Sequence, residues 1–293
     1  MSQLRTWTIA TGLILLAYAV ARSLPGTVVE PHAYYRDSAF EVIAHGGGRG
    51  LKPNDTLEAA QHAYQLQADV LEIDIHSSID GVLVLSHDET VDAQTNGSGL
   101  IREMTFAQLQ QLDAAQGFDA EQGASLSNTG IRIPALEAVF TALPKARYMI
   151  EIKQQSPSIA GPLCAMLRKH GLQQQVLVAS FGTPALDEFR QLCPEVATSF
   201  SQPETTWLVL LHKLGLAHLY PLKGVALQVP VESSGISIVT PRFVQDMHDR
   251  GLQVQVWTIN DEQQMRELIE LGVDGIITDY PDRLRSVVGK PPG

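Results

Sequence analysis

Two short segments carry carboxylates at a spacing that suits metal binding. In LEIDIH (71–76), Glu72 and Asp74 are two residues apart, and in EIK (151–153) Glu151 and Lys153 have the same spacing. Side chains two apart on a strand point to the same face. Three carboxylates without a thiolate suit a hard cation, Mg²⁺ or Ca²⁺. Solvated strand ends, or a Glu–Lys ion pair, would give the same pattern.

Glycines and histidines add groups that could hold an anion and move protons. The glycines of HGGGRG (45–50) let backbone N–H groups approach a phosphate, and Arg49 can donate two hydrogen bonds to it. A tight turn is the alternative. His45 and His87 end strand-like runs and are candidates for proton transfer, or else structural histidines. Trp257 ends another run, as a wall of the substrate site or as part of the core.

These residues lie in alternating strand-like and helix-like segments. Runs rich in β-branched residues recur eight times, mostly separated by segments of helical period. This order predicts an α/β chain with a (β/α)8 TIM barrel and its chemistry at the C-terminal ends of the strands. The interval after the second strand is longer and contains VLVLSHD and QTNGSG, which predicts a small insertion over about 77–130. The predicted strands are 41–46, 69–76, 146–153, 175–181, 196–200, 224–230, 253–259 and 275–280.

The N-terminal residues predict a hydrophobic helix that precedes the barrel. Residues 6–21 carry no charge and lie between Arg5 and Arg22. As a helix they span about 24 Å, short of the roughly 30 Å bilayer core. We expect a membrane anchor or a cleaved signal peptide over 1–25, with a buried helix as the third possibility. Either of the first two exports the body, which is then anchored facing the periplasm or exterior, or periplasmic or secreted after cleavage. A linker at 26–40, a barrel domain at 41–286 and a tail at 287–293 complete the predicted organisation.

Composition limits the possible partners. Hydrophobic residues make up 44% and charged residues 18% of the 293, which is typical of a globular chain. The 21 Lys and Arg against 32 Asp and Glu give a net charge of −11, which argues against nucleic acid as a partner. Two cysteines, Cys164 and Cys193, are too few for a disulfide scaffold. Export would permit a bridge between them, but we expect two free thiols, since a disulfide needs Cα atoms within about 7 Å.

An ordered set of motifs resembles the glycerophosphodiester phosphodiesterase family over residues 41–286. The set is IAHGGGRGLKPNDTLEAA, LEIDIHSSIDGVLVLSHDETVDAQTNGSG, IPALEAVF, EIK, VWTIN and GVDGIITDYP, in this order. The resemblance implies a (β/α)8 barrel with a lid-like insertion after the second strand. It also implies hydrolysis of glycerophosphodiesters to glycerol 3-phosphate and an alcohol, with a divalent metal ion as cofactor.

The resemblance implies roles for individual residues as well. The metal-binding acids of the family fall on Glu72, Asp74 and Glu151, and its acid/base histidines fall on His45 and His87. Lys153 matches the lysine of the EIK motif and is expected beside the phosphate. We assign His45 as the base and His87 as the acid. We also expect the 2-hydroxyl of the substrate to attack first and form a cyclic phosphate.

Two motifs depart from the family pattern. The family opens with His-Arg-Gly, whereas this chain has Gly46 in the arginine position, and we expect Arg49 to contact the phosphate instead. The PENT of the family reads PNDT here, so Asn54 and Asp55 replace Glu and Asn. We expect Asp55 to cap the helix that follows.

Two other functions are compatible with these features. One is a lysophospholipase D that acts on lysophospholipids at a membrane, which an N-terminal anchor would favour. The other is a non-catalytic binding domain on a barrel scaffold, because a fold does not fix a function. The presence of His45, Glu72, Asp74, His87 and Glu151 together opposes this last possibility.

Overall fold

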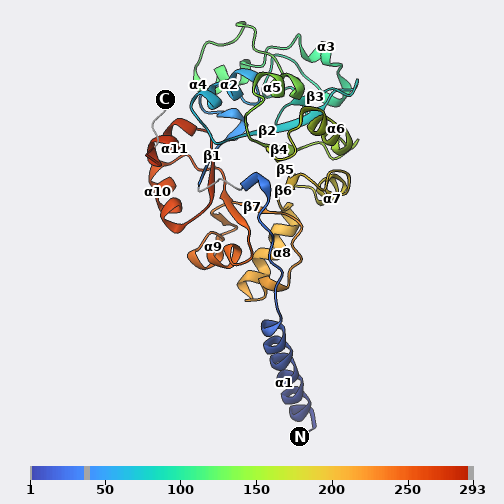
Figure 1. Ribbon diagram of the computed structural model, residues 1–293, viewed down its shortest axis with the longest axis vertical. Coiled ribbons are helices and arrows are strands. Elements are labelled where there is room, and N and C mark those ends of the chain that lie inside the picture. The colour runs from blue at the N-terminus through green and yellow to red at the C-terminus, as the bar shows by residue number, and fades with distance from the viewer. Residues whose placement is uncertain (1, 36–39, 290–293) are drawn as a thin grey trace.

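The computed structural model describes residues 2–35 and 40–289. Eight parallel strands form a nearly closed barrel in the order β6-β5-β4-β2-β1-β11-β10-β7, and a bridge between Ser199 and Ala226 links its two edges. At least one helix lies between each barrel strand and the next barrel strand in the chain, and the helices surround the barrel (Figure 1). The predicted (β/α)8 TIM barrel is therefore confirmed.

All eight predicted barrel strands are present. Their bounds are β1 Glu41–Ala44, β2 Val70–Ser77, β4 Tyr148–Ile152, β5 Val176–Ala179, β6 Ala197–Thr198, β7 Ala226–Val229, β10 Gln253–Val256 and β11 Gly275–Thr278. The outer helices are α2 Leu57–Gln65, α5 Leu136–Ala142, α6 Ala160–His170, α7 Thr183–Leu192, α8 Gln202–Lys213, α9 Pro241–His248, α10 Glu262–Leu271 and α11 Pro281–Val287. A short 3-10 helix, η4 (Ala217–Leu219), and a hairpin, β8 (Glu232–Ser233) with β9 (Ile236–Ser237), lie on either side of β7 in the chain.

Apolar side chains fill the barrel interior. Ile43 of β1 lies in register with Val70 of β2 and with Ile277 of β11, and all three are buried. Met149 and Leu177 from β4 and β5 join the same cluster. Because these side chains occupy the interior, the barrel is a packed core rather than an open channel.

The insertion after β2 begins as an antiparallel strand. β3 (Leu83–Leu85) pairs with β2, with Ile75 opposite Leu85. The 3-10 helix η3 (Ile101–Glu103) and the helices α3 (Phe106–Leu109) and α4 (Gln116–Gln122) follow. The insertion buries a small apolar cluster of its own, which includes Val84 and Ile101. It is therefore a packed subdomain rather than a loose loop.

Residues 24–35, which belong mostly to the predicted linker, contact the N-terminal end of the barrel. Val29 N–H donates to the carbonyl of Arg250, which precedes β10. In the 3-10 helix η1 (Ala33–Tyr35), the Tyr34 ring lies 4.2 Å from the Arg147 guanidinium, which donates to the Tyr34 carbonyl at 2.7 Å. Tyr34 is buried, so η1 and Arg147 form a floor that closes this end of the barrel. Residues 36–39 of the predicted linker and 290–293 of the predicted tail lie outside the described residues.

The predicted N-terminal helix is present as α1 (Ser2–Ser23). It projects away from the body, beyond the end of α8 (Figure 1). Within the described residues, the structure contains no helix with both the length and the apolar character needed to cross a membrane.

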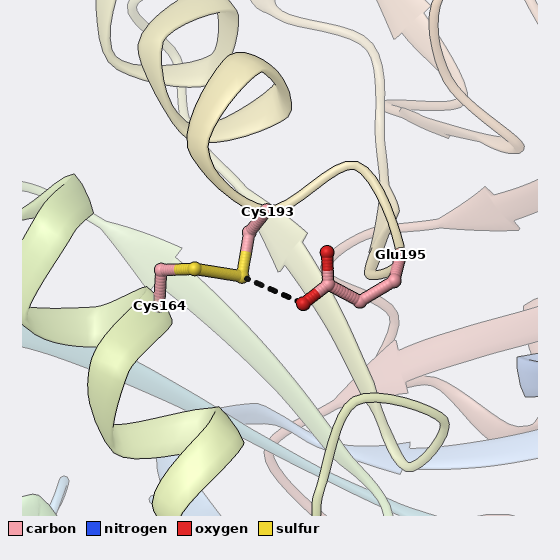
Figure 2. Close-up of side chains that lie close together, drawn as sticks. All are labelled: Cys164, Cys193 and Glu195. Carbon is pink, nitrogen blue, oxygen red and sulfur yellow. Dashed lines mark hydrogen bonds between the residues drawn. A yellow bond between two sulfur atoms is a disulfide. The ribbon is translucent and has the colours of Figure 1, made fainter.

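The two cysteines form a disulfide, so the prediction of two free thiols is wrong. Cys164 lies in α6 and Cys193 directly follows α7, and these neighbouring helices bring the two Cα atoms to 5.7 Å (Figure 2). Glu195 lies beside the bridge, with an oxygen 3.8 Å from Cys193 Sγ. Because a disulfide offers no thiolate, we do not assign a metal to this group of side chains.

Candidate active site

Strands β2 and β4 bring the three predicted carboxylates together. Asp74 lies in register with Glu151 on the neighbouring strand, and Glu72 lies two residues before Asp74 on the same face. Oxygens of all three lie within 4.8 Å of one another. Lys153 Nζ lies 3.2 Å from an oxygen of Asp74 and 3.2 Å from one of Glu151. The lysine therefore joins the acidic cluster, as the EIK spacing suggested.

Burial makes the charges of this cluster costly. Glu72 is 5% exposed and Asp74 is 1% exposed. Burial and repulsion from Asp74 raise the pKa of Glu72 well above its usual range and the pKa of Glu151 to about 7. Burial alone would lower the pKa of Lys153, but attraction to Asp74 and Glu151 raises it above its usual value. Two buried carboxylates and a third that is partly buried repel one another, and with oxygen donors only they fit a hard divalent cation.

His45 follows β1 and is held by residues that follow β10 and β11. Its Nδ1 lies 2.6 Å from Asp279 Oδ1, and Asn260 Nδ2 donates to the other oxygen of Asp279 at 2.7 Å. Burial would raise the pKa of Asp279, but the hydrogen bonds from His45 and Asn260 outweigh it and lower this pKa. Asp279 is therefore an anion that fixes the orientation of the His45 ring.

The glycine loop contacts the carboxylate cluster through its backbone. Gly46 N–H donates to Glu72 Oε2 at 2.7 Å. Gly46 has φ +54°, and a Cβ there would lie only 1.7 Å from Asn54 Oδ1. The two departures from the family pattern, at 46 and at 54, are thus in direct contact: the missing side chain at Gly46 leaves the space that Asn54 fills.

Asp55 does not cap the following helix, so that prediction is wrong. The N-cap of α2 is Thr56, whose hydroxyl accepts from Ala59 N–H at 3.2 Å. Asp55 instead has φ +53° and is fully buried, and its Oδ1 accepts from Asp74 N–H at 3.0 Å. Burial and repulsion from Asp74 and Glu72 raise its pKa well above its usual range. Asp55 therefore supports the strand that carries the cluster.

His87 and Arg49 line one small cavity of about 80 Å³. His87 lies two residues after β3, on the insertion, and its Nδ1 is 2.8 Å from Asp88 Oδ1. Its side chain is 43% exposed. Gln94 and Phe118 of the insertion line the same cavity. The predicted phosphate contact and one predicted proton-transfer group thus lie at a shared opening.

A second cavity of about 450 Å³ lies beside the carboxylates. It is lined by Glu151, Lys153, Gln155 and Phe181, among others. Trp257 packs edge-on against Phe181 with ring centroids 6.0 Å apart, and it also contacts the interior core. Trp257 therefore packs between the core and Phe181, which lines the cavity, and its role as a wall of the substrate site stays a prediction.

Asp279, Asn260 and Phe181 are the site residues that sequence reasoning missed. The motifs GVDGIITDYP and VWTIN contain the first two, but a lone Asp or Asn after a strand gives no signal for a histidine more than 200 positions away. A (β/α)8 topology supplies the missing information, because closure makes the first and last strands neighbours. A search of the residues after β11 for a carboxylate would have found Asp279.

A (β/α)8 barrel with an acidic cluster, a lysine and an Asp-paired histidine at the ends of its strands is typical of a TIM-barrel enzyme. A sequence profile of the Glycerophosphoryl diester phosphodiesterase family matches residues 45–283. The chain therefore belongs to this family, as its motifs suggested, and it is a phosphodiesterase enzyme. This excludes the reading as a non-catalytic binding domain.

The names of the relatives describe two enzyme activities. A glycerophosphodiester phosphodiesterase of Caldanaerobacter subterraneus subsp. tengcongensis is 30% identical over 254 residues, which cover 85% of this chain and 98% of the relative. A rat (Rattus norvegicus) protein named lysophospholipase D GDPD1 is 23% identical, over 83% of this chain and 84% of that protein. The solved structure of an Oleispira antarctica phosphodiesterase in complex with the product sn-glycerol-3-phosphate has a TM-score of 0.69 and 27% identity, covering 88% of this chain and all of that one.

Proposed function

We propose that this enzyme hydrolyses glycerophosphodiesters to glycerol 3-phosphate and an alcohol, with a divalent metal ion and two histidines. The cluster of Glu72, Asp74 and Glu151 carries the proposal, because three carboxylates within 4.8 Å of one another, two of them buried, need a cation or protons. These three would hold Mg²⁺ or Ca²⁺. The bound ion would supply positive charge that stabilises the negative charge developing on the phosphate oxygens. The product in the Oleispira antarctica structure supports the substrate class.

The remaining residues position the phosphate and move protons. Lys153 and Arg49 supply further positive charge to the phosphate oxygens. His45 has Nδ1 committed to Asp279, so Nε2 is the ring atom available to take the proton of the substrate's 2-hydroxyl. The 2-hydroxyl oxygen then bonds to phosphorus, the bond to the alcohol oxygen breaks, and His87 gives that oxygen a proton. Water opens the cyclic phosphate to glycerol 3-phosphate.

A hydrolysis panel tests the reaction and the metal together. It compares glycerophosphocholine, glycerophosphoethanolamine, glycerophosphoglycerol and lysophosphatidylcholine, with Mg²⁺, with Ca²⁺ and with excess chelator. We expect chelator to abolish hydrolysis, and Asp74→Asn and Glu151→Gln each to cost about 10²-fold or more. Full activity in excess chelator would refute the metal. Faster hydrolysis of lysophosphatidylcholine than of the deacylated diesters would instead favour lysophospholipase D activity.

A substrate without the 2-hydroxyl tests the nucleophile. Internal attack benefits from a very high effective concentration, so the 2-deoxy diester should react at least about 10²-fold more slowly than its parent. His87→Ala should slow substrates with poor leaving groups most, because p-nitrophenolate departs without an acid. Equal rates for the deoxy diester and its parent would show that water attacks the phosphate directly.

We also propose that the chain is exported and that α1 associates with a lipid surface. The uncharged stretch over residues 6–21 and the Cys164–Cys193 disulfide support this, because disulfides persist in oxidising compartments. A fusion of residues 1–40 to a reporter that is active only after export should be active. A stable fusion that stays silent would refute export.

A further inference from the structure

Helix α8 exposes large apolar side chains along one face. Trp207 is 58%, Leu210 47% and Leu214 50% exposed, and Leu214 is the residue that directly follows the helix. Their spacing of three and four residues places them on one side of α8, whereas Leu208 is fully buried against the barrel. We call these three residues the α8 apolar face. Single exposed apolar residues are ordinary, but a contiguous row marks a surface that contacts something other than water.

The last turns of α1 lie at one end of the α8 apolar face. The Tyr18 hydroxyl donates to the Leu214 carbonyl at 2.7 Å, and His218 Nε2 lies 3.0 Å from the Ala21 carbonyl. Beyond this junction α1 extends from the body, with Leu13, Ile14, Leu15 and Leu16 each more than 60% exposed (Figure 1). The exposed apolar surface of α1 is therefore continuous with that of α8.

The charges around this junction fit an anionic surface. Arg22 lies beside Gly215, and Lys213, which precedes Leu214, is exposed and donates to the Ser237 carbonyl at 2.8 Å. From Trp207 to Leu214 the sequence contains no acidic residue, although the whole chain carries a net charge of −11. A second copy of so acidic a chain is a poor match for this site. Anionic lipid head groups above an apolar layer match both its basic and its apolar side chains.

We propose that the α8 apolar face docks on the same anionic lipid surface as α1, with Trp207 at the level of the head groups. The proposal rests on the lipid association of α1 proposed above and adds a second contact made by the barrel itself. Two contacts fix the orientation of the barrel, which one helix alone would leave free to rotate.

The docked orientation determines which substrates reach the site. The carboxylates lie on β4 and β2, which are two and three strands away from β6, the strand that precedes α8. The insertion that carries His87 lies at the end of the molecule opposite α1 (Figure 1). The site therefore opens away from the lipid. It would take water-soluble glycerophosphodiesters in preference to lysophospholipids held in the same bilayer.

The three tryptophans of the chain allow each contact to be tested separately. They are Trp7 in α1, Trp207 in α8 and Trp257 at the site. The full chain with Trp7→Phe and Trp257→Phe retains only Trp207, and the chain with Trp207→Phe and Trp257→Phe retains only Trp7. Each is mixed with vesicles of phosphatidylglycerol and phosphatidylethanolamine, with and without brominated acyl chains.

We expect brominated lipid to quench both single tryptophans and the emission of Trp207 to shift to the blue on binding. Quenching of Trp7 without quenching of Trp207 would refute the α8 contact and leave the lipid association of α1 intact. If neither is quenched, both are refuted. Hydrolysis of soluble diesters, measured without vesicles, tests the proposed reaction independently.

Sedimentation with unbrominated vesicles tests the orientation. The variant with Leu210→Ser and Leu214→Ser should lower the partition constant about tenfold or more, since two half-exposed leucines lose their burial in lipid. The matched control is Ile79→Ser, which removes a 63% exposed apolar side chain from the insertion. It should bind like the unmodified chain. The reverse pattern would place the insertion on the lipid and overturn the proposal.

Discussion

The contact between His45 and Asp279 predicts a specific defect in an Asp279→Asn variant. The amide of Asn260 has a fixed orientation, because its Oδ1 accepts from Thr278 Oγ1 and from Asp279 N–H. Its Nδ2 therefore points at Asp279 Oδ2. In the variant, the new amide must turn its oxygen toward Asn260 and its NH₂ toward His45 Nδ1. His45 then carries its proton on Nε2 and cannot act as a base.

With the proton of His45 on Nε2, the Asp279→Asn variant should have a kcat about 10³- to 10⁴-fold lower than the unmodified enzyme. This loss corresponds to an activation barrier about 4 to 5.5 kcal/mol higher. Asp279→Ala should lose less, because the ring is then free to adopt either tautomer. The ¹⁵N shifts of the His45 ring report the tautomer directly, and steady-state hydrolysis of glycerophosphocholine reports the rate. The matched control is Asp261→Asn at the N-cap of α10, where Asn caps as well as Asp. A kcat within tenfold of the unmodified enzyme, with unchanged ring shifts, would refute this reasoning.

Three further predictions concern the cluster, the disulfide and the glycine loop. The pKa of Glu151 is raised to about 7, so without metal the native state keeps a proton that the unfolded state releases. The free energy of unfolding in chelator should therefore fall by about 3 kcal/mol between about pH 4.5 and pH 7, and Glu151→Gln should remove this fall in urea titrations. For the disulfide, thiol counting on denatured, unreduced protein should find no free thiol, and two titratable thiols would contradict the bond. Replacing both Cys164 and Cys193 with Ser should lower the free energy of unfolding by about 3 to 4 kcal/mol. For the glycine loop, Gly46→Ala should lower the free energy of unfolding by about 2 to 3 kcal/mol, because the position has a positive φ and the new Cβ clashes with Asn54. Adding Asn54→Ala should restore at least about 1 kcal/mol of this loss in thermal unfolding. No recovery would show that the clash is not the cause.

The sequence predicted correctly those features that depend on a single helix or strand, because regular residue patterns determine them. Strand-like runs gave all eight barrel strands, and the spacing of two placed Glu72 and Asp74 on one face without knowledge of their neighbours. Glu151 joined them because parallel neighbouring strands end at the same side of a barrel.

Features that depend on exact distances between elements were not predictable. Whether Cys164 and Cys193 form a disulfide depends on how closely α6 and α7 approach each other, and no residue pattern in the sequence indicates that distance. The same holds for Asp55, whose residue type suggested a helix cap. Its positive φ turns the side chain toward β2 instead, and the residue type alone does not indicate that backbone angle.

The floor that η1 and Arg147 form at the N-terminal end of the barrel determines where the chain could be cut without opening the barrel. A peptidase cut directly after Ala21 would remove α1 but leave residues 24–35 in place, including the hydrogen bond of Val29 to Arg250. Tyr34 would still cover the barrel interior, stacked on Arg147. A cut beyond residue 35 would uncover that interior. If α1 anchors the chain as proposed, the retained segment would let the anchored and the cleaved chain share one folded barrel. The position of the cut then decides whether the barrel stays closed.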